Sequence, residues 1–215
     1  EIGSGLVGSE MCIRDRTMNG RKNRISYRLV KLDKEERVID LNKPQLLKGF
    51  NEVTKGNGYY KARLSTAASP KELMAGNYML RSISKAKNTD HVIYTMESFE
   101  QYPDLHYATL DFKKSIRLTH GIDQQKDYLW GTAELVSWIS LDGRKLEGVV
   151  YKPADFDPAK KYPMIVSFYE RNSETLFNYR MPEPHRSTID YHLYNSNGYI
   201  VFNPDIRYVD GYPGE

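Results

Sequence analysis

Short apolar runs separated by turn residues recur about every 10–14 residues between residues 17 and 131, and no long helical pattern lies between them. Asn57-Gly58 is a tight-turn signal, and residues 69–73 are predicted to form a short helix or a turn. This spacing predicts an antiparallel meander, as in propeller blades or a sandwich. The predicted strands cover residues 25–30, 37–41, 59–64, 78–83, 91–96, 105–111 and 116–119.

A hairpin pattern follows this region. Residues 133–140 and 146–151 alternate apolar and polar side chains on either side of a turn that contains Asp142-Gly143. Pro153 ends the second of these runs, because proline has no N–H to extend a strand ladder.

Two apolar runs with a helical segment between them complete the chain. The run at 164–169 fits a central strand buried on both faces, and the run at 199–203 predicts a second buried strand. Residues 188–194 predict a helix that stops at Asn197-Gly198, and 205–207 open the following loop. This order of elements is similar to the opening of an α/β-hydrolase domain.

Residues 1–16 read EIGSGLVGSEMCIRDR, which resembles the translated sequencing-adaptor tails found on open reading frames from metagenomic assemblies. We therefore expect a non-native tail. Its Gly3-Ser4-Gly5-Leu6-Val7-Gly8 matches G-x-G-x-x-G, but only two residues precede it, so it cannot follow a strand as a dinucleotide-binding loop does.

Composition narrows the function classes. The net charge is +3, and basic residues are interleaved with acidic ones, which argues against a nucleic-acid-binding surface. No apolar run approaches the roughly 18 residues of a membrane span. Cys12 is the only cysteine, so a disulfide or thiolate-metal framework within the chain is excluded. Periplasmic and cytoplasmic locations both stay open, and no oligomeric state is assigned.

The hairpin and the segments around it carry a resemblance to a known family. The pattern S-W-x-S-x-D-G-x-x-L-E-G-x-x-Y-K-P-x-x-F-D-P-x-K-K-Y-P spans residues 137–163. It resembles the propeller-to-catalytic junction of the prolyl oligopeptidase and dipeptidyl peptidase family of serine peptidases. Residues 95–119 resemble the last propeller blade of that family, and 203–214 resemble its D-x-R-G-x-x-G-x-G loop, although Tyr208 replaces the first glycine.

The resemblance implies a mixed fold: the C-terminal blades of a β-propeller at 17–131, followed at 132–215 by the truncated start of an α/β-hydrolase domain. It implies a peptidase that hydrolyses short peptides through a serine acyl-enzyme, with no cofactor and no metal. The chain has no G-x-S-x-G elbow, so we expect the triad beyond Glu215 and an inactive fragment. An esterase or acylaminoacyl hydrolase of the same fold, or a non-catalytic β-rich binding module, are the alternatives.

Two site residues follow from the same resemblance. Tyr169 matches the tyrosine that donates to the oxyanion in the dipeptidyl peptidase branch; the alternative is a tyrosine that only packs. The small residues expected after it are replaced by Glu170-Arg171-Asn172. Arg207 matches a substrate-proximal arginine, and the alternative is a local ion pair with Asp205. We expect His106, His185 and His192 to be structural or surface residues.

Overall fold

The computed structural model describes residues 17–33, 35–184 and 189–207. These residues form two compact units, one made of 17–96 with Asp104–His120 and the other made of Glu97–Pro103 with the described residues from Gly121 onward. Some of the predictions concern residues outside the described ranges. These are the 1–16 tail with Cys12, His185, Tyr208, Gly211 and Gly214.

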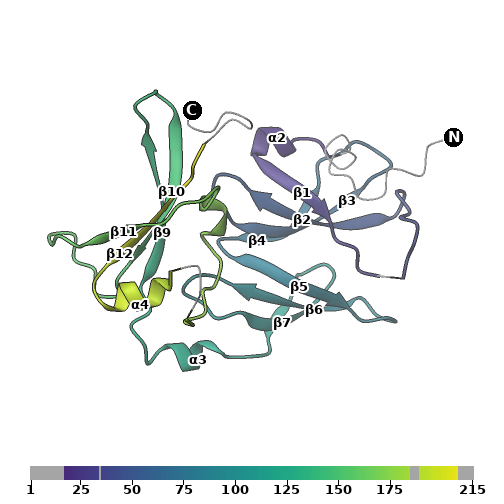
Figure 1. The fold of residues 1–215 in the computed structure, drawn as a ribbon. Helices are drawn as coiled ribbons and strands as arrows, with labels where there is room; N and C mark the ends of the chain where they lie inside the picture. The colour runs from purple at the N-terminus through teal and green to yellow at the C-terminus, as the bar shows by residue number, and fades with distance from the viewer. Residues whose placement is uncertain (1–16, 34, 185–188, 208–215) are drawn as a thin grey trace. The chain divides into compact units, whose positions relative to one another are not determined.

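The first unit contains two antiparallel sheets of four strands each (Figure 1). Short helix α2 (Gly20–Asn23) precedes the first strand. The strands of the first sheet, in spatial order, are β1 (Ile25–Leu29), β2 (Pro44–Asn51), β3 (Asn57–Arg63) and β4 (Lys71–Gly76). Those of the second are β5 (Met79–Lys85), β6 (His91–Glu97), β7 (Asp104–Thr109) and β8 (Ser115–Arg117).

The predicted turn at Asn57-Gly58 is wrong, because both residues lie inside β3. The turn falls earlier, where the Asn51 side-chain oxygen accepts hydrogen bonds from the Val53 and Thr54 amides. Asn57 is buried, and its Oδ1 accepts from the Leu80 amide at 3.2 Å. A Cβ on Gly58 would lie 2.7 Å from the Met74 carbonyl oxygen. The Asn-Gly pair therefore serves close packing between strands rather than a turn.

Two further local predictions are wrong. The strand expected at 37–41 is absent, because the backbone there folds into a turn in which Asp40 accepts from the Asn42 and Lys43 amides. The strand that pairs with β1 is β2 instead. Residues 71–76 form strand β4 rather than continuing the short helix or turn predicted at 69–73, since they pair with β3 while Leu73 and Met74 pack on the core.

The core of the first unit joins side chains from both of its sheets. Leu46 and Tyr59 come from the first sheet, and Leu80, Val92 and Tyr94 come from the second. The Tyr59 ring lies edge-on to Tyr94 at 5.9 Å between centroids. Two packed antiparallel meanders fit a propeller-like part, and no closed barrel is present among the described residues.

The second unit contains one mixed sheet with strand order β11-β12-β10-β9. Strands β9 (Thr132–Ile139) and β10 (Lys145–Lys152) form the predicted hairpin, with Gly143 in the turn at φ +77°. Strand β12 (Ile200–Pro204) pairs antiparallel with β10 and parallel with β11 (Met164–Val166). The helical segments are α3 (Ile122–Gln125), η1 (Ser173–Thr175) and α4 (Tyr191–Ser196).

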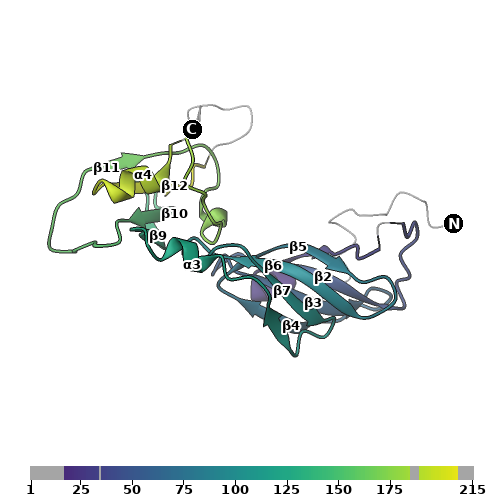
Figure 2. The same cartoon turned by 90° about the horizontal axis from the view of Figure 1, so that it is seen from below.

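Helix α4 contacts β10 and β12, and Figure 2 shows it beside them. It begins later than predicted, after the Asp190 side chain caps the His192 and Leu193 amides, and it ends before Asn197-Gly198, where Gly198 has φ +78°. Val149, Tyr151 and Val201 are fully buried on this face of the sheet.

The prediction that 164–169 is buried on both faces is wrong for the described structure. Met164 and Val166 are about half exposed. Ile165 pairs in register with buried Val201, so by strand alternation Met164 and Val166 lie on the opposite face from α4. Among the described residues only β12 pairs with β11, which leaves this strand at the sheet edge. No helix in the described part of the chain is long and apolar enough to cross a membrane.

Candidate functional site

The two predicted site residues follow neighbouring strands. Tyr169 lies shortly after β11, and Arg207 lies shortly after β12. Because these strands are parallel, their carboxyl ends meet at the same edge of the sheet. The Ser167 amide donates to the Phe202 carbonyl at 2.9 Å and extends the ladder, and the Ile206 amide donates to the Glu170 carbonyl at 3.0 Å. The structure therefore joins the loops that carry Tyr169 and Arg207.

Asp205 fixes this junction with its side chain. Its Oδ1 accepts from the Ser173 amide at 2.7 Å, and its Oδ2 accepts from the Ser173 hydroxyl at 2.6 Å. The Asp205 amide donates to the Glu147 carbonyl at 2.8 Å. The Asp205 carboxylate thus holds the loop after β12 against the start of η1, and the Asp205 backbone amide holds the same loop against β10.

Residues 170–172, which depart from the family pattern, build the same loop. The Asn172 side-chain amide donates to the Pro204 carbonyl at 3.3 Å. The Arg171 guanidinium forms an ion pair with the Glu174 carboxylate, at 3.6 Å between Nη1 and Oε1. These bulky polar residues, which were expected to reshape the segment, lie directly before η1, and Asn172 is the residue at its N-terminal cap position.

The side chains of Tyr169 and Arg207 both face solvent. Tyr169 is 81% exposed, so the phenol does not pack into the core. Arg207 is also exposed, and among the described residues it forms no ion pair with Asp205, whose carboxylate binds Ser173 instead. Both side chains are therefore exposed at this edge of the sheet.

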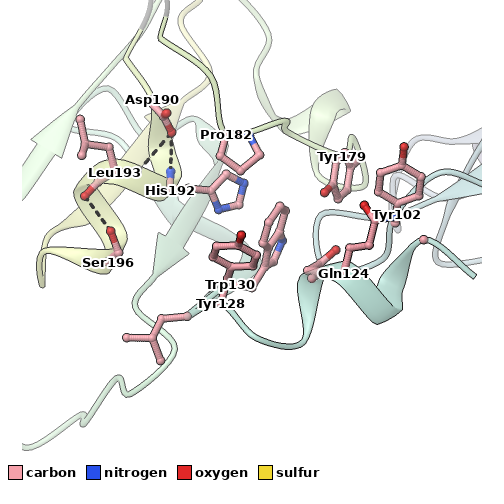
Figure 3. Close-up of a pocket in the computed structure, with 13 residues that line it drawn as sticks. Tyr102, Gln124, Tyr128, Trp130, Tyr179, Pro182, Asp190, His192, Leu193 and Ser196 are labelled. Carbon is pink, nitrogen blue, oxygen red and sulfur yellow. Dashed lines mark hydrogen bonds between the residues drawn. The ribbon is translucent and has the colours of Figure 1, made fainter.

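A pocket of about 530 Å³ in the second unit was not predicted from the sequence (Figure 3). Its aromatic lining comes from separate stretches of chain: Tyr102, Tyr128, Trp130, Tyr179 and His192. The Trp130 ring stacks on Tyr179 at 5.2 Å between centroids and lies 4.0 Å from His192. These residues have no regular spacing, so no sequence motif could have identified the pocket.

His192 is a buried structural residue, as expected. Its Nε2 lies 2.8 Å from the Arg180 carbonyl oxygen, and its ring stacks on Phe99 at 5.1 Å between centroids. Burial lowers the pKa of His192; the Arg180 carbonyl, Asp190 and the Trp130 backbone oppose that shift. We therefore expect a neutral ring at neutral pH.

His106 in the first unit is also buried, and it stacks on Tyr94 at 5.4 Å between ring centroids. Burial lowers its pKa, with Asp104 opposing the shift and Arg117 adding to it. Among the described residues no group of three or more His, Cys, Asp or Glu side chains is placed to hold a metal.

Removing the Asp205 carboxylate tests the loop junction. We expect Asp205→Ala to lower stability by about 2 kcal/mol, because hydrogen bonds to a charged group contribute about 1.5–3 kcal/mol. Limited proteolysis should then cut within residues 167–176. The matched control is Asp157→Ala, which removes a carboxylate that accepts from the Ala159 amide in another loop. Equal melting temperatures and equal digestion patterns for the two variants would contradict the assigned role.

Acidification tests the burial of neutral His192. Its folded pKa lies below its unfolded value of about 6.5, so the stability it contributes is present above that pH and is lost as the pH falls. Thermal melts at pH 7 and pH 5 should show a larger drop for the wild type than for His192→Phe, which retains a ring against Phe99 and Trp130. An equal drop in both proteins would show that His192 is not buried in its neutral form.

Comparison with known proteins gives structural matches only. No family model and no curated protein matches the chain. The structure of Porphyromonas gingivalis dipeptidyl peptidase 4 is similar, with a TM-score of 0.60 and 18% identity over 83% of this chain and 24% of that one. Acylaminoacyl peptidase in complex with Z-Gly-Gly-Phe-chloromethyl ketone gives a TM-score of 0.54 and 17% identity over 77% and 24% of the two chains.

Pyrococcus horikoshii acylaminoacyl peptidase gives a TM-score of 0.52 and 17% identity over the same shares of the two chains, 77% and 24%. The chain thus spans 24% of the length of each of these structures. Their low identity makes this a likeness of fold. The resemblance to prolyl oligopeptidase-family serine peptidases that the sequence predicts is confirmed at that level.

Proposed function

We propose that this chain is part of a serine-type peptidase that hydrolyses short peptides through an acyl-enzyme. In this proposal residues 17–131 are the C-terminal blades of a β-propeller, and 132–215 begin an α/β-hydrolase domain. The observation that carries the proposal is the pair of parallel strands β11 and β12, whose carboxyl-terminal loops are joined and expose Tyr169 and Arg207. Open α/β sheets bind their ligands at the carboxyl ends of parallel strands.

Tyr169 is proposed as an oxyanion donor. In acyl transfer a serine oxygen attacks the scissile carbonyl carbon, its proton passes to a histidine, and the carbonyl oxygen becomes negatively charged. The Tyr169 phenol would donate a hydrogen bond to that oxygen. Collapse of the intermediate then breaks the C–N bond, and the leaving amine takes the proton from the histidine.

Arg207 is proposed to contact the peptide substrate. Its guanidinium is exposed beside the junction, and it can donate paired hydrogen bonds to a carbonyl or carboxylate oxygen of a bound peptide. Asp205 acts indirectly, since its bonds to Ser173 hold the loop that precedes Arg207.

The nucleophile, base and orienting acid are proposed to come from residues outside this sequence, because its 215 residues contain no G-x-S-x-G elbow. The 215-residue piece alone should therefore lack peptidase activity. No metal or organic cofactor is part of the proposed chemistry.

Hydrolysis of acylaminoacyl substrates is the second candidate. The likeness to two acylaminoacyl peptidase structures favours it over other reactions of the same fold. Both candidates use the same acyl-enzyme chemistry and differ in the group attached to the scissile carbonyl.

A fluorophosphonate probe on the protein encoded by the parent open reading frame tests this proposal. We expect it to label a serine outside these 215 residues. Tyr169→Phe should lower kcat by about 10²–10³-fold on a peptide substrate, the usual loss for one oxyanion donor. Tyr199→Phe, which removes the hydroxyl of a tyrosine packed against Tyr194, should retain activity. Absence of labelling would leave a non-catalytic binding module, and labelling with an unchanged Tyr169→Phe rate would overturn the role of Tyr169.

A further inference from the structure

The exposed Tyr169 side chain takes its position from its backbone. The residue is 81% exposed, so the loop of residues 167–176 decides where the phenol hydroxyl lies. Asp205 holds this loop from the side of β12, through its bonds to Ser173 at the start of η1. A second set of contacts connects the end of η1 to α4.

Arg180 makes that second connection with its side chain. Its Nη2 donates to the Thr175 hydroxyl at 3.1 Å. The Thr175 hydroxyl donates in turn to the Asn172 carbonyl at 2.8 Å, and the Thr175 amide donates to the same carbonyl at 2.9 Å. Arg180 is therefore bonded to the last residue of η1, which is itself bonded to the residue before η1.

Contacts with α4 hold Arg180 in place. The guanidinium carbon lies 4.7 Å from the centroid of the Tyr191 ring, and the Arg180 carbonyl oxygen lies 2.8 Å from His192 Nε2. In the part of the chain that the structure describes, no ion pair joins Arg180 to a carboxylate. The group is held by its hydrogen bond and by the Tyr191 ring, so removing its charge would leave no carboxylate without a partner.

Tyr151 of β10 completes the surroundings of Arg180. Its side chain is fully buried, and its ring lies 4.6 Å from the Tyr191 ring, between centroids. Burial raises the pKa of Tyr151, and Arg180 opposes this shift. Thr175 also opposes it, whereas Tyr191 adds to it. The phenol thus lies close to both Arg180 and Thr175, on the buried face of the sheet.

We propose that Arg180 is a positioning residue, acting through Thr175 and η1 on the loop that carries Tyr169. This role rests on the proposed function, because it requires the Tyr169 phenol to donate to the oxyanion. Asp205 holds η1 at its first residue, and Arg180 holds it at its last. A misplacement of about 1 Å in a reacting group can cost about 10²-fold in rate, so loss of the Arg180 anchor should slow the chemical step.

Two substitutions in the protein encoded by the parent open reading frame test this role. Arg180→Met retains an unbranched stem but cannot donate to Thr175, and Thr175→Val removes only the hydroxyl. On a peptide substrate each should lower kcat about tenfold and leave KM within about twofold, because an oxyanion donor acts in the transition state. Thr175→Ser, which keeps the hydroxyl, should retain kcat. The matched control is Arg144→Met in the β9–β10 turn, where an exposed guanidinium pairs with Asp142, and it should leave both constants unchanged.

A double-mutant cycle separates positioning from a general loss of structure. If Arg180 acts through Tyr169, Arg180→Met should lower kcat by less than about twofold in the Tyr169→Phe background, because the hydroxyl that it positions is already absent. An equal fall of kcat in both backgrounds, or a higher KM with an unchanged kcat, would overturn the role of Arg180. A kcat unaffected by both Arg180→Met and Thr175→Val would overturn it too.

Fluorophosphonate labelling of the unmodified parent protein distinguishes the two levels of the argument. Absence of labelling would overturn the proposed function, and the role of Arg180 with it. Labelling together with a Tyr169→Phe defect, followed by any of the contrary results for Arg180, would overturn the positioning role alone.

Discussion

The parallel pairing of β11 with β12 determines the arrangement of the proposed catalytic edge. Parallel strands end at the same side of a sheet, so loops that are far apart in sequence leave the sheet together. Hydrogen bonds beyond the strand ends, from Ser167 to Phe202 and from Ile206 to Glu170, continue this pairing into the loops. The Asp205 carboxylate then binds Ser173 and prevents the two loops from separating. Tyr169 and Arg207 depend on this framework for their position, although neither takes part in it.

Aromatic packing organises the rest of the second unit. Phe99 comes from a stretch between strands β6 and β7, and its ring lies 4.9 Å from Tyr151 and 5.1 Å from His192, between centroids. Trp130 bonds the Phe99 carbonyl and stacks on Tyr179. Trp130, Tyr179 and His192 of this aromatic cluster also line the pocket.

The sequence predicts the order of the strands and helices better than it predicts which residues and strands pack against them. The β9–β10 hairpin and the strand–helix–strand order of β11, α4 and β12 agree with the alternating and continuous apolar patterns. The prediction of a turn at Asn57-Gly58 is wrong because asparagine and glycine also suit close packing between strands. That packing depends on the Leu80 amide, which donates to Asn57, and on the Met74 carbonyl, which lies close to Gly58. The apolar run at 164–169 indicates a strand, but a run alone does not reveal which face has a neighbour. Tyr169 and Arg207 are placed together by strand order, whereas the Ser173–Asp205 bond and the aromatic pocket join residues whose spacing carries no pattern.

Amide hydrogen exchange of the unmodified protein, measured by NMR, tests the loop junction most directly. The Ser173 and Ile206 amides lie outside the strands, and each donates to a partner in the other loop. If the junction holds these loops, both amides should exchange nearly as slowly as those of β12. Exchange of both amides at the rate of an unstructured peptide would contradict the account, because the loops that carry Tyr169 and Arg207 would then not be held together.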